Sequence, residues 1–240
     1  IAKAIAAIHN LDTALVENSH LASFEPAEIV RGRVAELDRF AATGKVPSVL
    51  LSRWEQALED TSLFRFKPTV IHGALSGDAI LEQDHNISGV IDWKNLQIND
   101  PAIDFAWLIP SGDQELVDAV LLNYQLARSG ADANIALRAT LYSELELAKW
   151  LLHGYTRRDA AVVEDAVSML QELAALATAG ELIPLTQAQM PVAPVASYQT
   201  EVVEEEIETV TVVSSAWSLD NESEVDDSTK PIQTQRDDLF

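Results

Sequence analysis

The chain has 240 residues, of which 38 are acidic and 16 are basic, so its formal net charge is −22 at pH 7. A protein this acidic repels nucleic acid and anionic lipid, so we expect neither as a partner, whereas cationic partners or substrates are favoured. The absence of cysteine excludes disulfides and thiolate metal sites and favours the reducing cytoplasm. No apolar run reaches the ~20 residues that a membrane-spanning helix needs.

Residues 1–64 carry the pattern of helices. Apolar residues recur at three- and four-residue spacing in the first eleven positions. A second helix opens at Glu25–Glu28, whose acidic side chains suit the positive end of the helix dipole. That helix is predicted to run to Gly44, and Pro47 begins a third one.

Residues 65–110 change character, because short β-type runs replace the helical spacing. Asp84–Asn86 lies between two such runs and predicts a hairpin turn. After them, Asp100 and Pro101 predict the start of a helix, with Asp100 as its N-cap and Pro101 in the first helical position. The predicted strands are 69–72, 79–83 and 87–93.

Residues 111–180 return to the helical pattern. Gly130 and Gly154 are expected to separate the helices, and Gly180 is expected to end the last one. The three predicted helices are 116–128, 134–155 and 159–178.

From about Pro184 the composition shifts. Residues 191–240 carry 12 acidic residues against Lys230 and Arg236, and they show no helical stripe. We therefore predict a disordered acidic tail at 184–240. The tail could serve solubility alone, or Glu201–Val213 could add a strand to a partner. A third reading makes the tail the functional part and the folded region its platform.

The most specific motif lies in residues 70–102. His72-Gly73-Ala74-Leu75 is followed by Ile80-Leu81, then by Ile91-Asp92-Trp93, and then by Asp100-Pro101-Ala102. This order and spacing resembles the catalytic centre of the aminoglycoside/macrolide phosphotransferase family. The family pattern is His-Gly-Asp-Leu, three residues, Asn-Ile-Leu, and a hairpin that leads to Ile-Asp-Trp or Ile-Asp-Phe.

The resemblance implies a fold class as well as a site. We expect an α+β, mostly helical domain at residues 1–183, equivalent to the C-terminal lobe of the protein-kinase-like fold, with a small β-hairpin at the active cleft. The N-terminal lobe, which supplies a phosphate-binding Lys and a nucleotide-covering loop in the family, is expected to lie upstream of Ile1.

The resemblance also implies which side chains would act. In the family, the Asp of His-Gly-Asp accepts the proton of the acceptor hydroxyl, while the Asn and the Asp of Ile-Asp-Trp bind the Mg²⁺ that accompanies ATP. Here Ala74 stands at the catalytic Asp position and Ala79 at the Asn position, and only Asp92 is kept. Loss of a general base typically costs roughly 10²–10⁴-fold in rate, and a methyl group offers Mg²⁺ no oxygen. We therefore predict a catalytically impaired relative that binds Mg²⁺ and ATP weakly.

Asp78 leaves an alternative open. If the loop shifted by one residue, Asp78 could bind the metal in place of residue 79, and the protein would be an active ATP-dependent phosphotransferase on a small-molecule hydroxyl. Asp78 is also a suitable turn-forming or capping residue, which would give it a structural role only.

Five other polar residues receive roles from the resemblance. His72 and Asp100 are expected to brace the catalytic loop. Asp104, Glu144 and Glu146 are candidate contacts to a cationic or polyhydroxyl substrate, because the helix predicted at 134–155 would flank the cleft. Trp150 and Tyr155 on that helix could stack on a substrate ring, or they could pack in the core.

Overall fold

The computed structural model describes residues 1–128, 130 and 132–186, all within a compact unit that spans Ile1–Ala193. The predicted acidic tail from residue 187 onward lies outside the described residues. The α-helices are α1 (Ala2–His9), α2 (Ala14–Asn18), α3 (Pro26–Ala42), α4 (Ser48–Glu59), α5 (Gln114–Ala127), α6 (Ile135–Arg157) and α7 (Ala160–Ala179). The strands are β1 (Thr69–Ile71), β2 (Ile80–Gln83), β3 (Asn86–Val90) and β4 (Gln97–Asn99), and the 3-10 helices are η1 (Gly77–Ala79), η2 (Trp93–Asn95) and η3 (Pro101–Ser111).

Side chains at the helix ends explain where the long helices start and stop. Glu25 and Glu28 form a reciprocal capping box at the start of α3. The carboxylates of Asp113 and Asp159 accept backbone N–H groups in the first turns of α5 and α7. Gly180 ends α7 in the left-handed conformation, at φ +72°, as the sequence predicts.

The strands form two antiparallel ribbons. The β2–β3 hairpin turns at Asp84 and His85, both with positive φ, which is the backbone that suits a tight hairpin. Strand β4 was not predicted; it pairs with β1 in the register Thr69–Asn99. On its other edge, Ile98 of β4 exchanges backbone hydrogen bonds with the chain just before α3, at Ala22 and Phe24.

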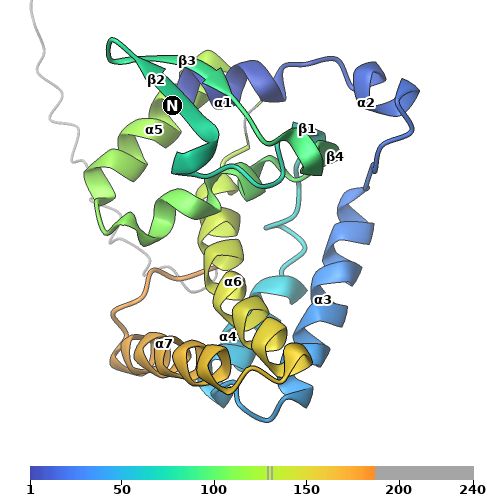
Figure 1. Ribbon diagram of the computed structural model, residues 1–240. Coiled ribbons are helices and arrows are strands. Elements are labelled where there is room, and N and C mark those ends of the chain that lie inside the picture. The colour runs from blue at the N-terminus through green and yellow to red at the C-terminus, as the bar shows by residue number, and fades with distance from the viewer. Residues whose placement is uncertain (129, 131, 187–240) are drawn as a thin grey trace, which may run out of the picture. The chain divides into compact units, whose positions relative to one another are not determined.

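Helix α6 is the centre of the core. It packs against η3, α7 and α3, and Figure 1 shows it running between these elements. Its buried apolar face includes Leu141, Leu145 and Leu151, which are fully shielded from solvent. The packed chain continues past the predicted boundary at residue 183, because Leu185 and Thr186 are both buried. None of the helices in the described residues is long and apolar enough to cross a membrane.

Two predictions need correction, one about Gly154 and one about the helix that begins at Pro101. Gly154 does not separate helices but lies inside α6. Glycine suits this position because α7 passes so close that a Cβ there would lie 2.7 Å from a methyl carbon of Val162. The helix that begins at Pro101 is a 3-10 helix, not an α-helix, and it contains Pro110, which has no N–H to donate in the last turn.

Candidate active site

The loop after β1 is held by one carboxylate of η3. Asp104 Oδ2 accepts the backbone N–H of His72 at 2.8 Å, and its Oδ1 accepts the backbone N–H of Gly73 at 2.8 Å. Asp104 is fully buried, so these charge-assisted bonds form away from solvent. The motif residues His72 and Gly73 are therefore fixed to the start of η3 by a side chain 31 or 32 residues further along the chain.

A buried histidine completes the environment of Asp104. His9, at the end of α1, places Nε2 3.1 Å from Asp104 Oδ2 and Nδ1 2.8 Å from the hydroxyl of Tyr124. Burial lowers the pKa of His9, so the ring is neutral at pH 7. The hydrogen-bond network assigns the proton to Nε2, which donates to Asp104, while Nδ1 accepts from Tyr124. Arg128 donates in turn to the Tyr124 hydroxyl.

His72 joins the loop to the chain after β3. Its Nε2–H donates to the carbonyl oxygen of Ile91 at 2.8 Å, and its ring lies against Trp93 with centroids 4.8 Å apart. Gly73 allows the backbone of this loop to lie close to the chain after β3. It has φ +79°, and a Cβ there would lie 2.4 Å from the carbonyl oxygen of Asn95.

Asp92 sits at the junction between β3 and η2. Its backbone is left-handed, at φ 67° and ψ 46°, a conformation that a non-glycine residue adopts at a cost and that is found often at functional sites. The carboxylate is half exposed, and Lys94 Nζ lies 3.1 Å from its Oδ2. A lysine ammonium is thus paired with the carboxylate that the resemblance assigns to metal binding.

The two alanines of the motif lie in different surroundings. Ala74 lines a cavity of about 700 Å³, which we call the acceptor cavity. Ala79 is buried within the main hydrophobic cluster, and its carbonyl oxygen accepts the N–H of Ile91 at 2.9 Å. Asp78 is the middle residue of η1 and is exposed, and its carboxylate makes no hydrogen bond with the described residues.

These surroundings do not fit a bound Mg²⁺. Mg²⁺ requires several oxygen ligands in near-octahedral geometry. Within residues 1–128, 130 and 132–186, no three His, Asp or Glu side chains lie close enough together to hold a metal ion. Asp92 is the one family ligand present, and its carboxylate already pairs with Lys94.

The charged residues that face the acceptor cavity are paired with one another or with neighbours. Glu146 accepts from Lys149 at 2.5 Å, and both line the cavity. Arg33 also lines it, donates to Glu36 at 2.7 Å and lies over the ring of Tyr142 at 4.9 Å. The uncharged part of the wall mixes apolar and aromatic side chains, such as Ile103 and Trp107, with the polar side chains of Asn95, Gln97 and Asn99.

Two of the acidic residues assigned to the substrate do not line this cavity. Asp104 is fully buried and holds the loop after β1. Glu144 is buried, and its carboxylate accepts from Arg53 Nε at 3.0 Å, Arg53 Nη2 at 2.8 Å and Trp54 Nε1 at 2.8 Å. Glu146 is the one of the three that reaches the cavity.

The two aromatic residues of α6 do not line the acceptor cavity either. Trp150 and Tyr155 are 39% and 50% exposed, so they are not core residues. Trp150 stacks on His153 and donates from Nε1 to Asp165 at 2.9 Å.

The hydrogen bonds of the Asp100 side chain go to η3 and α6, whereas Asp104 holds the loop after β1. Asp100 caps η3 by accepting the N–H of Ala102 at 2.8 Å, as its position before Pro101 predicts. Its carboxylate also accepts hydrogen bonds from Nε and Nη2 of Arg138 at 2.7 and 3.0 Å, and from the hydroxyl of Tyr142 at 2.6 Å. Burial opposes the charge of Arg138, but Asp100 and Asp132 outweigh it and raise the pKa of Arg138.

Sequence reasoning missed His9, Arg138 and Lys94. An arginine in the apolar pattern of a helix, like Arg138, is a usable signal for a buried ion pair, because burial of an unpaired charge is costly. His9 gives no such signal, since its partner Asp104 lies 95 residues away.

The sequence pattern described as the phosphotransferase enzyme family matches residues 1–140. The chain belongs to this family. No curated protein matches it significantly in sequence. Among solved structures, it is similar to a macrolide 2′-phosphotransferase type I, with a TM-score of 0.65 at 24% identity, covering 70% of this chain and 56% of that one. A macrolide 2′-phosphotransferase, MphH from Brachybacterium faecium, gives 0.62 at 22% identity, covering 70% and 57%.

A third similar structure is the GDP and kanamycin complex of an aminoglycoside phosphotransferase, with a TM-score of 0.62 at 16% identity, covering 75% of this chain and 61% of that one. The chain thus spans 56–61% of the length of these three structures. At these identities the likeness establishes the kinase-like phosphotransferase fold, and the solved relatives include nucleotide complexes.

Proposed function

We propose that this protein binds a small molecule in the acceptor cavity of a phosphotransferase fold whose transfer chemistry is strongly impaired. The observation that carries the proposal is the pair of methyl groups at Ala74 and Ala79, where the family motif has a base and a metal ligand. The pairing of Asp92 with Lys94 supports it further, because a bound ammonium competes with a divalent ion for that carboxylate. The absence of cysteine is consistent with the cytoplasm as its location.

The cavity favours a ligand with few charges. Each charged side chain on its wall already has a partner of opposite sign, Arg33 with Glu36 and Lys149 with Glu146. A polycation would find no unpaired carboxylate there, while Trp107 and Tyr142 offer aromatic surface. We therefore expect a hydroxyl-bearing compound with few charges, closer to a macrolide than to an aminoglycoside.

The alternative function is active phosphoryl transfer with Asp78 in the metal-binding role. One observation favours it: the Asp78 carboxylate is exposed and makes no hydrogen bond with the described residues, so no structural contact must break for it to bind a metal. A base at position 74 would still be missing, since the side chain there is a methyl group.

Turnover measurements separate the two functions. ATP consumption is measured on the full-length protein with a panel of macrolides and aminoglycosides, for the wild type, Asp78→Asn, and the double variant Ala74→Asp/Ala79→Asn. We expect no turnover by the wild type and a gain of about 100-fold or more over background in the double variant. Turnover by the wild type that disappears in Asp78→Asn would establish the alternative instead.

A further inference from the structure

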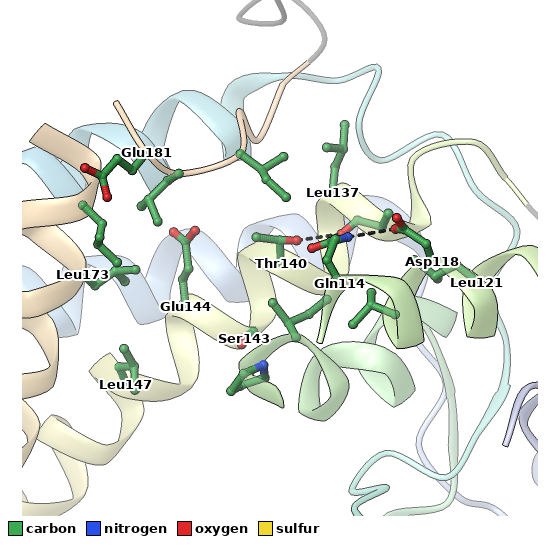
Figure 2. A pocket seen from close by; sticks show the side chains of 17 residues that line it. Gln114, Asp118, Leu121, Leu137, Thr140, Ser143, Glu144, Leu147, Leu173 and Glu181 are labelled. Carbon is green, nitrogen blue, oxygen red and sulfur yellow. Dashed lines mark hydrogen bonds between the residues drawn. The ribbon is translucent and has the colours of Figure 1, made fainter. Parts of the chain in front are cut away.

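A second cavity adjoins the acceptor cavity and has no part in the phosphotransferase motif. It lies between η3, α5, α6 and α7 and has a volume of about 440 Å³. Figure 2 shows its apolar wall, which includes Leu121 of α5, Leu137 of α6 and Leu173 of α7. A volume of 300–1,000 Å³ with mostly apolar walls and a few polar groups is typical of a small-molecule site.

The two cavities share only Pro110, Ser143 and Leu147. The second cavity is lined by none of the motif residues 72–75 or 91–93. We call it the α5–α7 cavity.

The charges of the α5–α7 cavity all have one sign. Its charged lining residues are Asp118, Glu144 and Glu181, and no Lys, Arg or His lines it. Glu144 is neutralised by Arg53. The other two carboxylates form no ion pair with the described residues, which distinguishes this cavity from the acceptor cavity, where each charged side chain is paired.

Asp118 is the better placed of these two carboxylates. Gln114 Nε2 donates to its Oδ1 at 2.8 Å, so a neutral amide orients the carboxylate without cancelling its charge. Figure 2 shows this pair at one end of the row of lining side chains and Glu181 at the other end. The Glu181 carboxylate makes no hydrogen bond or ion pair with the residues that the structure describes.

We propose that the α5–α7 cavity binds a small apolar amine, whose aliphatic or aromatic body contacts the leucine side chains and whose ammonium group pairs with Asp118. Apolar burial supplies the affinity, and the unpaired negative charge selects the cation over a neutral or anionic compound of the same shape. The proposal does not depend on phosphoryl transfer, because no residue of the catalytic motif takes part.

Three compounds of matched shape test it on the 240-residue chain: 4-phenylbutylamine, 4-phenylbutan-1-ol and 4-phenylbutanoate. Dissociation constants are measured by calorimetry, and methyl NMR shifts locate the amine on the wild type. We expect the amine to bind about tenfold more tightly than the anion, with shifts at Val117, Leu121 and Leu173. Asp118→Asn should weaken amine binding about two- to fivefold and leave the alcohol unchanged, whereas Asp38→Asn, the same change on an exposed position of α3, should alter neither.

A variant that fills the cavity gives an independent test. Ala136→Phe adds a ring to the wall and should abolish binding of all three compounds, and a thermal melt shows whether it still folds. If it does not fold, the methyl shifts of the wild type decide the location. No amine binding at millimolar concentration would overturn the proposal. So would equal affinity for amine and anion, or shifts confined to the acceptor cavity.

Discussion

Asp104→Asn should destabilise the protein much more than an ordinary surface substitution. The fully buried carboxylate accepts three hydrogen bonds, from the backbone N–H groups of His72 and Gly73 and from Nε2 of His9. An asparagine keeps one oxygen, which can still accept from His72 and His9. Its NH2 group then faces the N–H of Gly73, so two buried donors oppose each other.

The expected cost follows from that loss. One charge-assisted hydrogen bond of about 1.5–3 kcal/mol disappears and a buried N–H loses its acceptor, so we expect destabilisation of about 2–4 kcal/mol. With a urea m-value of about 2 kcal/mol per molar, the unfolding midpoint should fall by about 1–2 M. Tryptophan fluorescence follows the transition, and Asp38→Asn, with the same chemical change on an exposed residue, should stay within about 0.5 kcal/mol of the wild type. A midpoint for Asp104→Asn equal to that of Asp38→Asn would refute the assigned role of Asp104 in holding the loop.

Three further predictions concern the same region. Burial lowers the pKa of His9, so the unfolded chain binds a proton at this residue more readily than the folded chain does. The contribution of His9 to the free energy of unfolding should be complete above about pH 6.5 and decrease as the pH drops below it. In urea titrations between pH 5 and 7, His9→Gln should make the free energy of unfolding less dependent on pH. Gly73→Ala should lower the stability measured by thermal unfolding clearly more than Gly44→Ala does. Both residues have positive φ, which costs an alanine about 1–2 kcal/mol, but only at Gly73 would the Cβ also meet a carbonyl oxygen. Equal losses of stability would mean that the loop moves freely. In the Ala74→Asp/Ala79→Asn background, Lys94→Ala should raise Mg²⁺ affinity by up to about fivefold, the size of an exposed ion pair, and an unchanged affinity would show that Lys94 does not compete with the metal.

Local signals in the sequence predicted local structure well. The start of α3 follows from Glu25 and Glu28, which need only each other to cap the helix. The β2–β3 hairpin follows from polar residues between two short apolar runs, and the capping role of Asp100 follows from the proline after it. The kinase-like phosphotransferase fold was predicted because its motif residues occur in a fixed order with short spacing.

Contacts between distant segments could not be predicted in this way. Strand β4 has three residues, too few for an alternating pattern, and it exists because β1 and the chain before α3 pair with its two edges. Glu144 was assigned to the substrate from its helix, but which face of α6 meets the cavity depends on how α4 packs there and presents Arg53 and Trp54. The pairing of Lys94 with Asp92 depends on the left-handed backbone of Asp92, which the sequence does not specify.

Calorimetric titration of Mg-ATP into the full-length wild type and into its Ala74→Asp/Ala79→Asn variant tests the central claim most directly, with a thermal melt to show that both are folded. The account predicts no Mg²⁺-dependent ATP binding by the wild type and a measurable gain in the double variant, because the restored carboxylate and amide supply oxygen ligands that two methyl groups lack. Micromolar Mg-ATP binding by the wild type would contradict the account and show that other residues have replaced the two missing side chains.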